Sequence, residues 1–293
     1  MTPRVFDRAL LARRRARAAA DLVPGIDFLL ERVVEDMADR LAAVERRFPL
    51  ALDLMGHTGL VADMLAASGK VDRVVRLERE PRLLRPGDVA VIAEEEALPF
   101  AEESLDLVAS ALSLQFANDL PGALVQIRRA LKPDGLFLAV MAGGNTLAEL
   151  REAAMAAEIE LTGGASPRVA PFADVRAVGS LLQRAGFALP VVDRDVVTVR
   201  YESPLALLYE LRAMGAGNVL VERDREPMPR QLLMRICEVY VERFAEDDGR
   251  IPATFEFVSM SGWAPHESQP KPLAPGSARI SLADALKRPG KEA

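Results

Sequence analysis

Cysteine and histidine are nearly absent from this chain of 293 residues. Cys237 is the only cysteine, so the chain can form neither an intrachain disulfide nor a cysteine-ligated metal cluster. The only histidines are His57 and His266, which is too few for a multi-histidine metal site. The sequence therefore gives no reason to expect a metal centre.

Long apolar runs and a strong net charge are missing as well. No run approaches the roughly 20 apolar residues that a membrane-spanning helix needs, and no secretory signal is visible. The net charge of −6 gives no general attraction to nucleic acid or to anionic membranes. We therefore expect a soluble cytoplasmic protein with no nucleic-acid partner and no integral membrane segment.

Basic residues concentrate at the start of the chain. Residues 1–20 contain one acid, Asp7, and six arginines: Arg4, Arg8, Arg13, Arg14, Arg15 and Arg17. Residues 4–19 are predicted to be helical. Their arginines are interpreted either as a solvated face or as a positive lip over a ligand site or docking patch. An organelle transit peptide is disfavoured because the segment lacks a serine-rich spacer.

Short apolar runs alternate with amphipathic helical runs in the first half of the chain. Strands are predicted at 50–54, 71–77, 88–93, 105–112 and 136–141, with a turn at 132–135. Helices are predicted at 27–47, 59–68 and 120–131, the first of them capped by Asp27. This alternation predicts a doubly wound, mostly parallel α/β sheet whose ligand site lies at the carboxyl ends of its strands.

The second half of the chain completes the sheet and adds helices. Strands are expected at 189–201 and 254–264, which brings the sheet to seven strands, and helices at 146–161, 171–185, 203–214 and 229–244. The last two helices have no room in a minimal sheet, so residues 203–246 are predicted to form a cap beside the site. We expect N-terminal helices in 1–48, the main domain in 49–264 and a disordered tail in 265–293, with a helical turn or two near 282–286.

Acidic residues follow three of the predicted strands. Asp53 precedes a turn that contains Gly56 and Gly59, where backbone N–H groups can approach a ligand. Glu78 ends the second strand, and a carboxylate there can accept two hydrogen bonds from a ribose diol. Taken singly, such residues are also compatible with an ordinary turn or a polar strand end.

The third strand is followed by Glu94 and Glu95, and then by Leu98. A carboxylate at this point can accept a hydrogen bond from the exocyclic amino group of an adenine, while Leu98 supplies an apolar wall. An acidic solvated loop is the alternative interpretation. The joint spacing of the three acidic sites is more specific than any one of them.

Residues 50–141 resemble the class I S-adenosylmethionine-dependent methyltransferases, in particular those in which an acid and Leu-Pro-Phe follow the third strand. The resemblance implies a Rossmann-like fold with S-adenosyl-L-methionine as cofactor and methyl transfer to a protein or a carrier-bound substrate. It assigns cofactor binding to Asp53, Gly56, His57, Gly59, Glu78, Glu94, Glu95 and Leu98.

Motifs outside this region carry a closer resemblance over residues 6 to about 263. They are Phe6-Asp7-Arg8 and the segments 118–124, 143–151 and 163–172. The set is similar to respiratory complex I assembly factors that hydroxylate an arginine of a complex I subunit, and also to the malonyl-carrier-protein methyltransferases of biotin synthesis. A complex I subunit and a carrier-bound small molecule are therefore the partners that the resemblance implies.

The turn after the first strand departs from the family pattern. Met55 and His57 stand where the family has two glycines, and a non-glycine residue with positive φ costs on the order of 1 kcal/mol. One expectation is a shifted loop in which Gly56 takes over a glycine role and His57 faces the cofactor carboxylate. The other is weakened or lost binding, which would make the chain a non-catalytic binding protein. We favour retained binding.

The exit of the fourth strand also departs from the family. Gln115 and Phe116 replace a His-Trp pair that is common in relatives, so a histidine base is absent there. Methyl transfer by direct displacement depends mainly on positioning, so the loss does not exclude it. Substrate-facing candidates are Gln115, Phe116, Asn118 and Arg168, each with packing or capping as the alternative, and no catalytic residue is identified.

Overall fold

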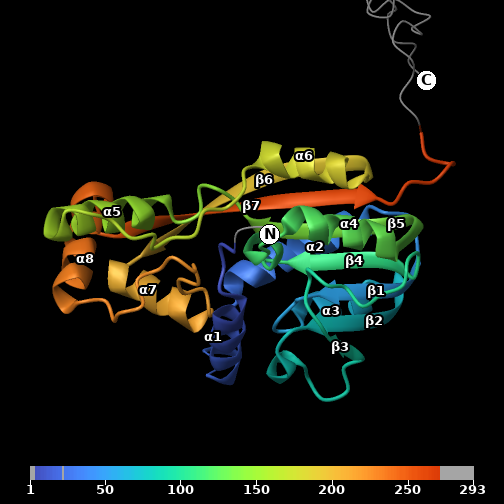
Figure 1. Cartoon of the computed structure of the whole chain (residues 1–293), viewed down its shortest axis with the longest axis horizontal. Coiled ribbons are helices and arrows are strands. Elements are labelled where there is room, and N and C mark those ends of the chain that lie inside the picture. Colours follow the sequence, from blue (N-terminus) through green and yellow to red (C-terminus); the bar gives the residue numbers. More distant parts are fainter. Residues whose placement is uncertain (1–3, 22, 271–293) are drawn as a thin grey trace, which may run out of the picture.

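A seven-stranded sheet forms the centre of the computed structural model, which describes residues 4–21 and 23–270 (Figure 1). Its strands are β1 Phe48–Leu54, β2 Val71–Glu78, β3 Ala90–Ile92, β4 Leu105–Ala111, β5 Leu131–Ala142, β6 Ala188–Tyr201 and β7 Ile251–Trp263. The order is β3-β2-β1-β4-β5-β7-β6, with parallel pairing through β5 and antiparallel pairing of β7 with both neighbours. The predicted doubly wound, mostly parallel sheet is confirmed.

Helices cover both faces of the parallel strands. They are α2 Phe28–Ala42 and α3 Leu60–Ala67 on one face, and α4 Leu120–Ala130 and α6 Val175–Ala185 on the other. Strand β5 shows why both faces are apolar: Leu136, Leu138 and Val140 pack toward α2, while Phe137 and Met141 pack toward α4 and α6. Alternate residues of a strand point to opposite faces, so a strand covered on both sides is apolar at every position.

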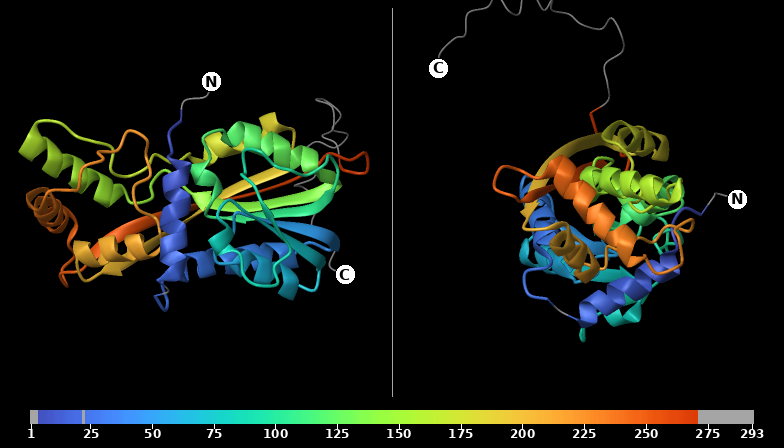
Figure 2. Two further views of the ribbon diagram at one scale, coloured as in Figure 1. Left: turned by 60° about the horizontal axis from the view of Figure 1, so that its bottom comes forward. Right: turned by 90° about the vertical axis from the view of Figure 1, so that its left-hand side faces the viewer.

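A second lobe extends from the far edge of the sheet. Strands β6 and β7 run on past β5 as a two-stranded ribbon that carries α5 Ala148–Thr162, α7 Pro204–Ala213 and α8 Arg230–Phe244 (Figures 1 and 2). Helices α7 and α8 lie within residues 203–246, for which a cap is predicted, and α5 packs against α8. We call this lobe the cap. Buried residues of the cap, such as Leu207 and Ile236, belong to the same apolar cluster as the α2 face of the sheet.

Helix α1, Arg8–Ala20, lies between the two lobes (Figure 2). It begins at Arg8 rather than at residue 4, because the Asp7 side chain caps it by accepting a hydrogen bond from Leu10 N at 3.0 Å. Just before the helix, Phe6 forms an antiparallel bridge with Leu220, and Val221 N donates to Val5 O. Residues 5 and 6 are thus joined to the loop between α7 and α8.

Three local predictions need correction. Residues 132–135 are part of β5, where the register with β4 shifts and Asp134 has a φ of 63°, so the predicted turn is a bulge within a strand. Asp27 precedes α2 but its side chain makes no capping hydrogen bond. Helix α2 also ends at Ala42, five residues early. The helical turn predicted at 282–286 lies outside the described residues.

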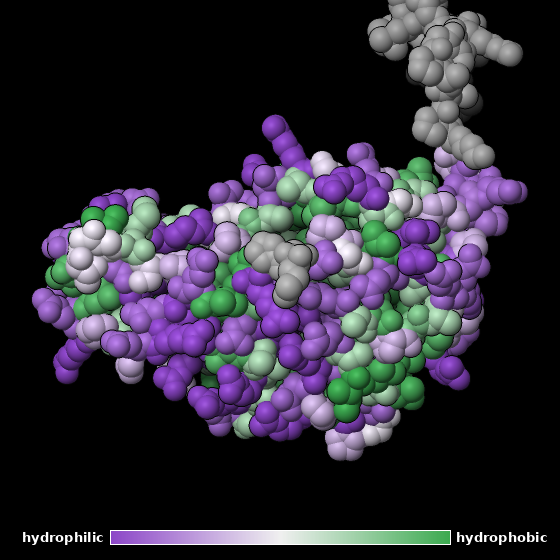
Figure 3. Space-filling view, in the orientation of Figure 1, coloured by the Kyte–Doolittle hydropathy of each residue, from purple (hydrophilic) through white to green (hydrophobic). Residues whose placement is uncertain are grey.

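One edge of the sheet is β6, and the other is the short strand β3. Figure 3 shows apolar residues gathered over this region on a largely polar face, and Val89 and Ile92 are exposed there. A strand of three residues offers few unpaired backbone groups to another chain, which limits edge-to-edge pairing. Among the described residues, no helix is both long enough and apolar enough to cross a membrane.

Candidate functional site

The turn after β1 keeps a left-handed backbone at both positions where glycine was expected. Met55 has a φ of 60° and His57 a φ of 46°, whereas Gly56 between them lies outside this region. Gly56 therefore does not take over a left-handed position from Met55 or His57. Gly56 is required for another reason: a Cβ placed on it would lie 2.0 Å from Asp53 Oδ1.

Arg76 holds this turn from the neighbouring strand. Its side chain is buried and donates from Nε to Asp53 Oδ2 at 3.2 Å, from Nη1 to Asp88 Oδ2 at 2.5 Å and from Nη2 to His57 O at 2.9 Å. Nη1 also lies 3.3 Å from Leu83 O. A single guanidinium therefore ties the β1 turn to the segment between β2 and β3.

Glu78 stands at the end of β2, as predicted. One carboxylate oxygen, Oε1, accepts a hydrogen bond from His57 N at 2.6 Å, while the other, Oε2, is buried without a partner in the described structure. Burial raises the pKa of Glu78 to about 7, although the nearby Arg15 opposes the rise. The site therefore contains a carboxylate that titrates near neutrality and has one free acceptor atom.

Asp53 is fully buried beneath the turn. Burial raises its pKa to about 6, and the charge of Arg76 limits the rise. Its Oδ1 has no partner within residues 4–21 and 23–270. Asp53 contacts Gly56 and Arg76 on the buried side of the turn, and these contacts help to fix the conformation of the turn.

The His57 ring is neutral at physiological pH. Burial lowers its pKa well below the usual value, and the positive charge of Arg15 lowers it further. Nε2 lies 3.5 Å from Ser113 Oγ, and Nδ1 is buried with no partner in the described part of the chain. The ring can therefore offer a hydrogen bond to a ligand but no charge, so it is not the source of a pH dependence near neutrality.

The acids after β3 face Arg8 of α1. Its Nη1 lies 2.9 Å from Glu94 Oε2 and 3.2 Å from Glu96 Oε1, and its Nη2 pairs with Glu95. Burial raises the pKa of Glu95, and the Arg8 charge opposes the rise. Leu98 donates its backbone N–H to Gln126 Oε1 at 3.0 Å. The predicted adenine-side acids therefore already have a cationic partner.

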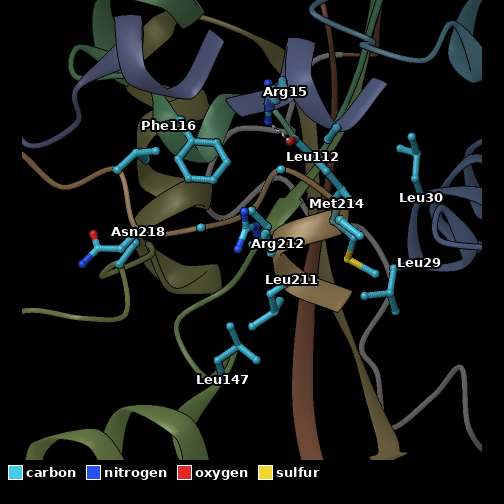
Figure 4. Close-up of a pocket in the computed structure, with 18 of the residues that line it drawn as sticks. Arg15, Leu29, Leu30, Leu112, Phe116, Leu147, Leu211, Arg212, Met214 and Asn218 are labelled. Carbon is cyan, nitrogen blue, oxygen red and sulfur yellow. Dashed lines mark hydrogen bonds between the residues drawn. The ribbon is translucent and has the colours of Figure 1, made fainter. Parts of the chain in front are cut away.

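A cavity of about 640 Å³ lies between the strand ends and the cap. Its wall is mainly apolar, with Leu29 and Leu30 from α2 and Leu211 and Met214 from the cap (Figure 4). The β1 turn reaches the cavity through His57 and Thr58, and the following residues border it: Arg15, Gln115, Phe116, Arg168 and Arg212. Gln115 Oε1 is buried and finds no hydrogen-bond partner in the part of the chain that the structure describes. The Phe116 ring packs edge-on against Phe6 and Phe172.

Two substrate-facing candidates are otherwise engaged. Asn118 does not border the cavity: its Oδ1 accepts from Val5 N and Phe6 N, both at 2.8 Å, and its Nδ2 donates to Phe6 O. It therefore holds residues 5 and 6 in place, and the N-cap of α4 is Asp119 instead. Arg168 borders the cavity but forms a two-point ion pair with Glu158, at 3.1 and 2.6 Å.

Sequence reasoning missed Arg76 as the residue that organises the turn. The available signal was an arginine inside the apolar run Val74-Val75-Arg76-Leu77, since a buried charge needs a partner. Ser113 was also missed; its hydroxyl donates to Met55 O at 2.7 Å. No group of three or more potential metal ligands occurs in the described ranges.

Replacing Gly56 with alanine should destabilise the protein, because the new Cβ would collide with the fixed Asp53 carboxylate. We expect the Gly56→Ala variant to lose about 1–3 kcal/mol of unfolding free energy in urea denaturation. Gly164→Ala is the matched control, since a Cβ there meets nothing within 4 Å. Equal losses in the two variants would contradict the close approach.

Comparisons with known proteins agree with this fold. Residues 52–139 match the family described as methyltransferase domain. The chain is 40% identical to the mitochondrial arginine-hydroxylase NDUFAF5 of Danio rerio, over 97% of this chain and 90% of that protein. It is 34% identical to the malonyl-[acyl-carrier protein] O-methyltransferase of Laribacter hongkongensis, over 89% and 87%.

Among solved structures, the YcgJ protein of Bacillus subtilis is similar with a TM-score of 0.55 and 13% identity, covering 79% of this chain and 99% of that chain. At that identity the likeness shows the fold alone. The sequence relatives extend over nearly the whole chain and carry the family assignment. The chain belongs to the family of methyltransferase-domain proteins that includes the NDUFAF5 arginine-hydroxylases and the malonyl-[acyl-carrier protein] O-methyltransferases.

Proposed function

We propose that this protein is an S-adenosyl-L-methionine-dependent methyltransferase whose acceptor group enters the cavity between the strand ends and the cap. The observation that carries the proposal is Glu78, whose buried Oε2 has no hydrogen-bond partner among the described residues and lies next to a turn with the left-handed backbone that glycine adopts readily. A ribose hydroxyl can supply the hydrogen-bond donor that Oε2 lacks. The preserved turn supports retained binding despite Met55 and His57.

The other proposed cofactor residues divide by role. Asp53 and Gly56 shape the turn, His57 and Gly59 form its remaining part, and Glu94, Glu95 and Leu98 form the side nearer β3. Glu78 is 1% exposed, so a ligand reaches Oε2 only when the atoms that cover it move aside. Bound S-adenosylmethionine would supply an electrophilic methyl group for transfer to a nucleophilic atom.

The chain's own contribution would be positioning and the exclusion of water. An in-line displacement needs the acceptor held close to the methyl group, and proximity of this kind supplies most of the rate. The apolar cavity wall excludes water, and the neutral His57 ring and the Gln115 amide offer hydrogen bonds without moving a proton. This arrangement suits methyl transfer, which needs no strong base when the acceptor is already anionic.

The charge around the cavity favours an anionic acceptor. The cavity wall contains one acid, Asp27, and five arginines: Arg15, Arg82, Arg85, Arg168 and Arg212. Three of these arginines have acidic partners, whereas Arg15 and Arg212 form no ion pair within the described residues. An acceptor with a carboxylate on a carrier protein would find a counterion in Arg212.

A radiolabel assay tests methyl transfer to such an acceptor. Purified protein, S-adenosylmethionine with a labelled methyl group and malonyl carrier protein should give labelled carrier. Arg212→Gln should raise the KM for the carrier by about tenfold, because a charge-assisted hydrogen bond is lost, and leave cofactor affinity unchanged. Absence of label, together with normal cofactor binding, would reject this acceptor.

A second candidate is modification of an arginine on a subunit of respiratory complex I. It is supported by the 40% identity to NDUFAF5 over 97% of the chain, which exceeds the identity to the carrier-protein methyltransferases. Mass spectrometry of complex I from cells that lack the protein should then show one unmodified arginine. An unchanged arginine mass together with normal assembly would remove this candidate. The predicted cytoplasmic location remains a prediction, since the similar arginine-hydroxylases are named as mitochondrial.

Cofactor affinity should depend on pH through Glu78. A ribose diol donates to the ionised carboxylate, and a pKa of about 7 leaves Glu78 mostly protonated below neutrality. Affinity for S-adenosylhomocysteine should therefore rise about tenfold between pH 6 and pH 8 in calorimetry. The Glu78→Gln variant should bind weakly and without this slope.

The same titration decides whether the chain binds the cofactor at all. A pH-independent affinity in the wild type would contradict the role of Glu78. No heat and no thermal stabilisation at millimolar ligand would leave the non-catalytic binding protein as the remaining interpretation.

A further inference from the structure

The order of the strands determines which part of the proposed cofactor would lie at which strand end. Along β3-β2-β1-β4, Glu94 and Glu95 follow β3 and Glu78 ends β2. The next place is the junction of β1 and β4, where the turn 55–59 meets Leu112 and Ser113. A ligand with its base near β3 and its ribose at β2 would therefore have its amino-acid end at this junction. This step rests on the proposed function.

Arg15 of α1 lies at that junction. Its Nη2 donates to Leu112 O at 2.9 Å, and its Nη1 lies 3.2 Å from Ser113 Oγ. The guanidinium carbon is 5.3 Å from the centre of the Phe116 ring, and Figure 4 shows the side chain at the cavity with its bond to Leu112. Both hydrogen-bond partners are neutral, and no acidic side chain of the described residues forms an ion pair with Arg15, although the charges of Glu78 and Glu95 act on it from nearby. The guanidinium can therefore still pair directly with a ligand anion.

The other cations along this edge are already engaged. Arg76 bonds to Asp53, Asp88 and two carbonyl groups, and Arg8 pairs with the three glutamates after β3. Arg85 binds both oxygens of Asp63. Arg212 is free of ion pairs in the described structure but approaches the cavity from the cap. Arg15 is thus the available cation at the β1–β4 junction.

We propose that Arg15 binds the carboxylate of the cofactor's amino-acid end and thereby selects ligands that carry it. The partly buried guanidinium is favourable for this role, because a charged hydrogen bond is stronger where access of water is restricted. Burial lowers the pKa of Arg15 to about 10, which still leaves it protonated at neutral pH. Its ring contact with Phe116 restricts the side chain to the junction.

A pair of nucleosides tests the assignment by calorimetry. S-adenosylhomocysteine and 5′-methylthioadenosine share adenine, ribose and a thioether, but only the first has an amino-acid end. Arg15→Gln should weaken the binding of S-adenosylhomocysteine at least about tenfold and change the affinity for 5′-methylthioadenosine by less than about twofold. Unchanged 5′-methylthioadenosine binding also shows that the variant is folded.

Two further variants separate charge from position. Arg17→Gln makes the same charge change on an exposed residue of α1 and should leave both affinities unchanged. Arg15→Lys keeps the charge and should retain most of the preference for S-adenosylhomocysteine. If Arg15→Gln weakened the binding of both ligands equally, or of neither, the assignment would be overturned. If the wild type bound neither ligand, the proposed function itself would be rejected.

Discussion

The buried guanidinium of Arg76 is the interaction on which the site depends. The guanidinium compensates the charge of Asp53, which is fully buried. Water does not compete for this interaction, because the Arg76 side chain is only 2% exposed. Removing one partner from a buried ion pair typically costs about 3–5 kcal/mol, since the other charge is left without compensation. Arg76 also bonds to His57 O, so the same residue that neutralises Asp53 fixes the backbone of the turn.

That constraint explains how Met55 and His57 can occupy a left-handed backbone. Strain of about 1–3 kcal/mol persists only where the surroundings over-determine the conformation. Here the surroundings are specific: Glu78 accepts from His57 N, Arg76 donates to His57 O, and Ser113 donates to Met55 O. Met55 and His57 are thus held in a backbone conformation that glycine adopts readily, and the backbone N–H groups of such a turn can approach a ligand.

Local pattern was sufficient to predict the sheet but not the partners of its charged residues. Short apolar runs placed the central strands, because a strand buried on both faces is apolar at nearly every position. Strand β6, which is partly exposed, was placed by its alternation of apolar and polar residues. The acids Asp53, Glu78 and Glu94 were placed correctly at strand ends for the same reason. Their partners come from elsewhere in the chain: Arg8 meets Glu94 across 86 residues. Asn118 was misassigned because its partner Phe6 is 112 residues away, and helix α5 was not assigned to the cap because its contact with α8 is also non-local.

Helix α1 connects the two halves of the proposed site. At one end Arg8 holds the glutamates after β3, and further along Arg15 bonds to the end of β4. The same segment is joined to the cap loop, because Asp7 N donates to Val219 O at 2.8 Å and Arg14 Nη1 donates to Asn218 O at 2.6 Å. Arg15 of the same helix lies close enough to Glu78 for its charge to lower the pKa of that carboxyl. A ligand that shifted α1 would therefore act on the cap loop as well, and linkage requires that a molecule bound under the cap act in turn on the cofactor side.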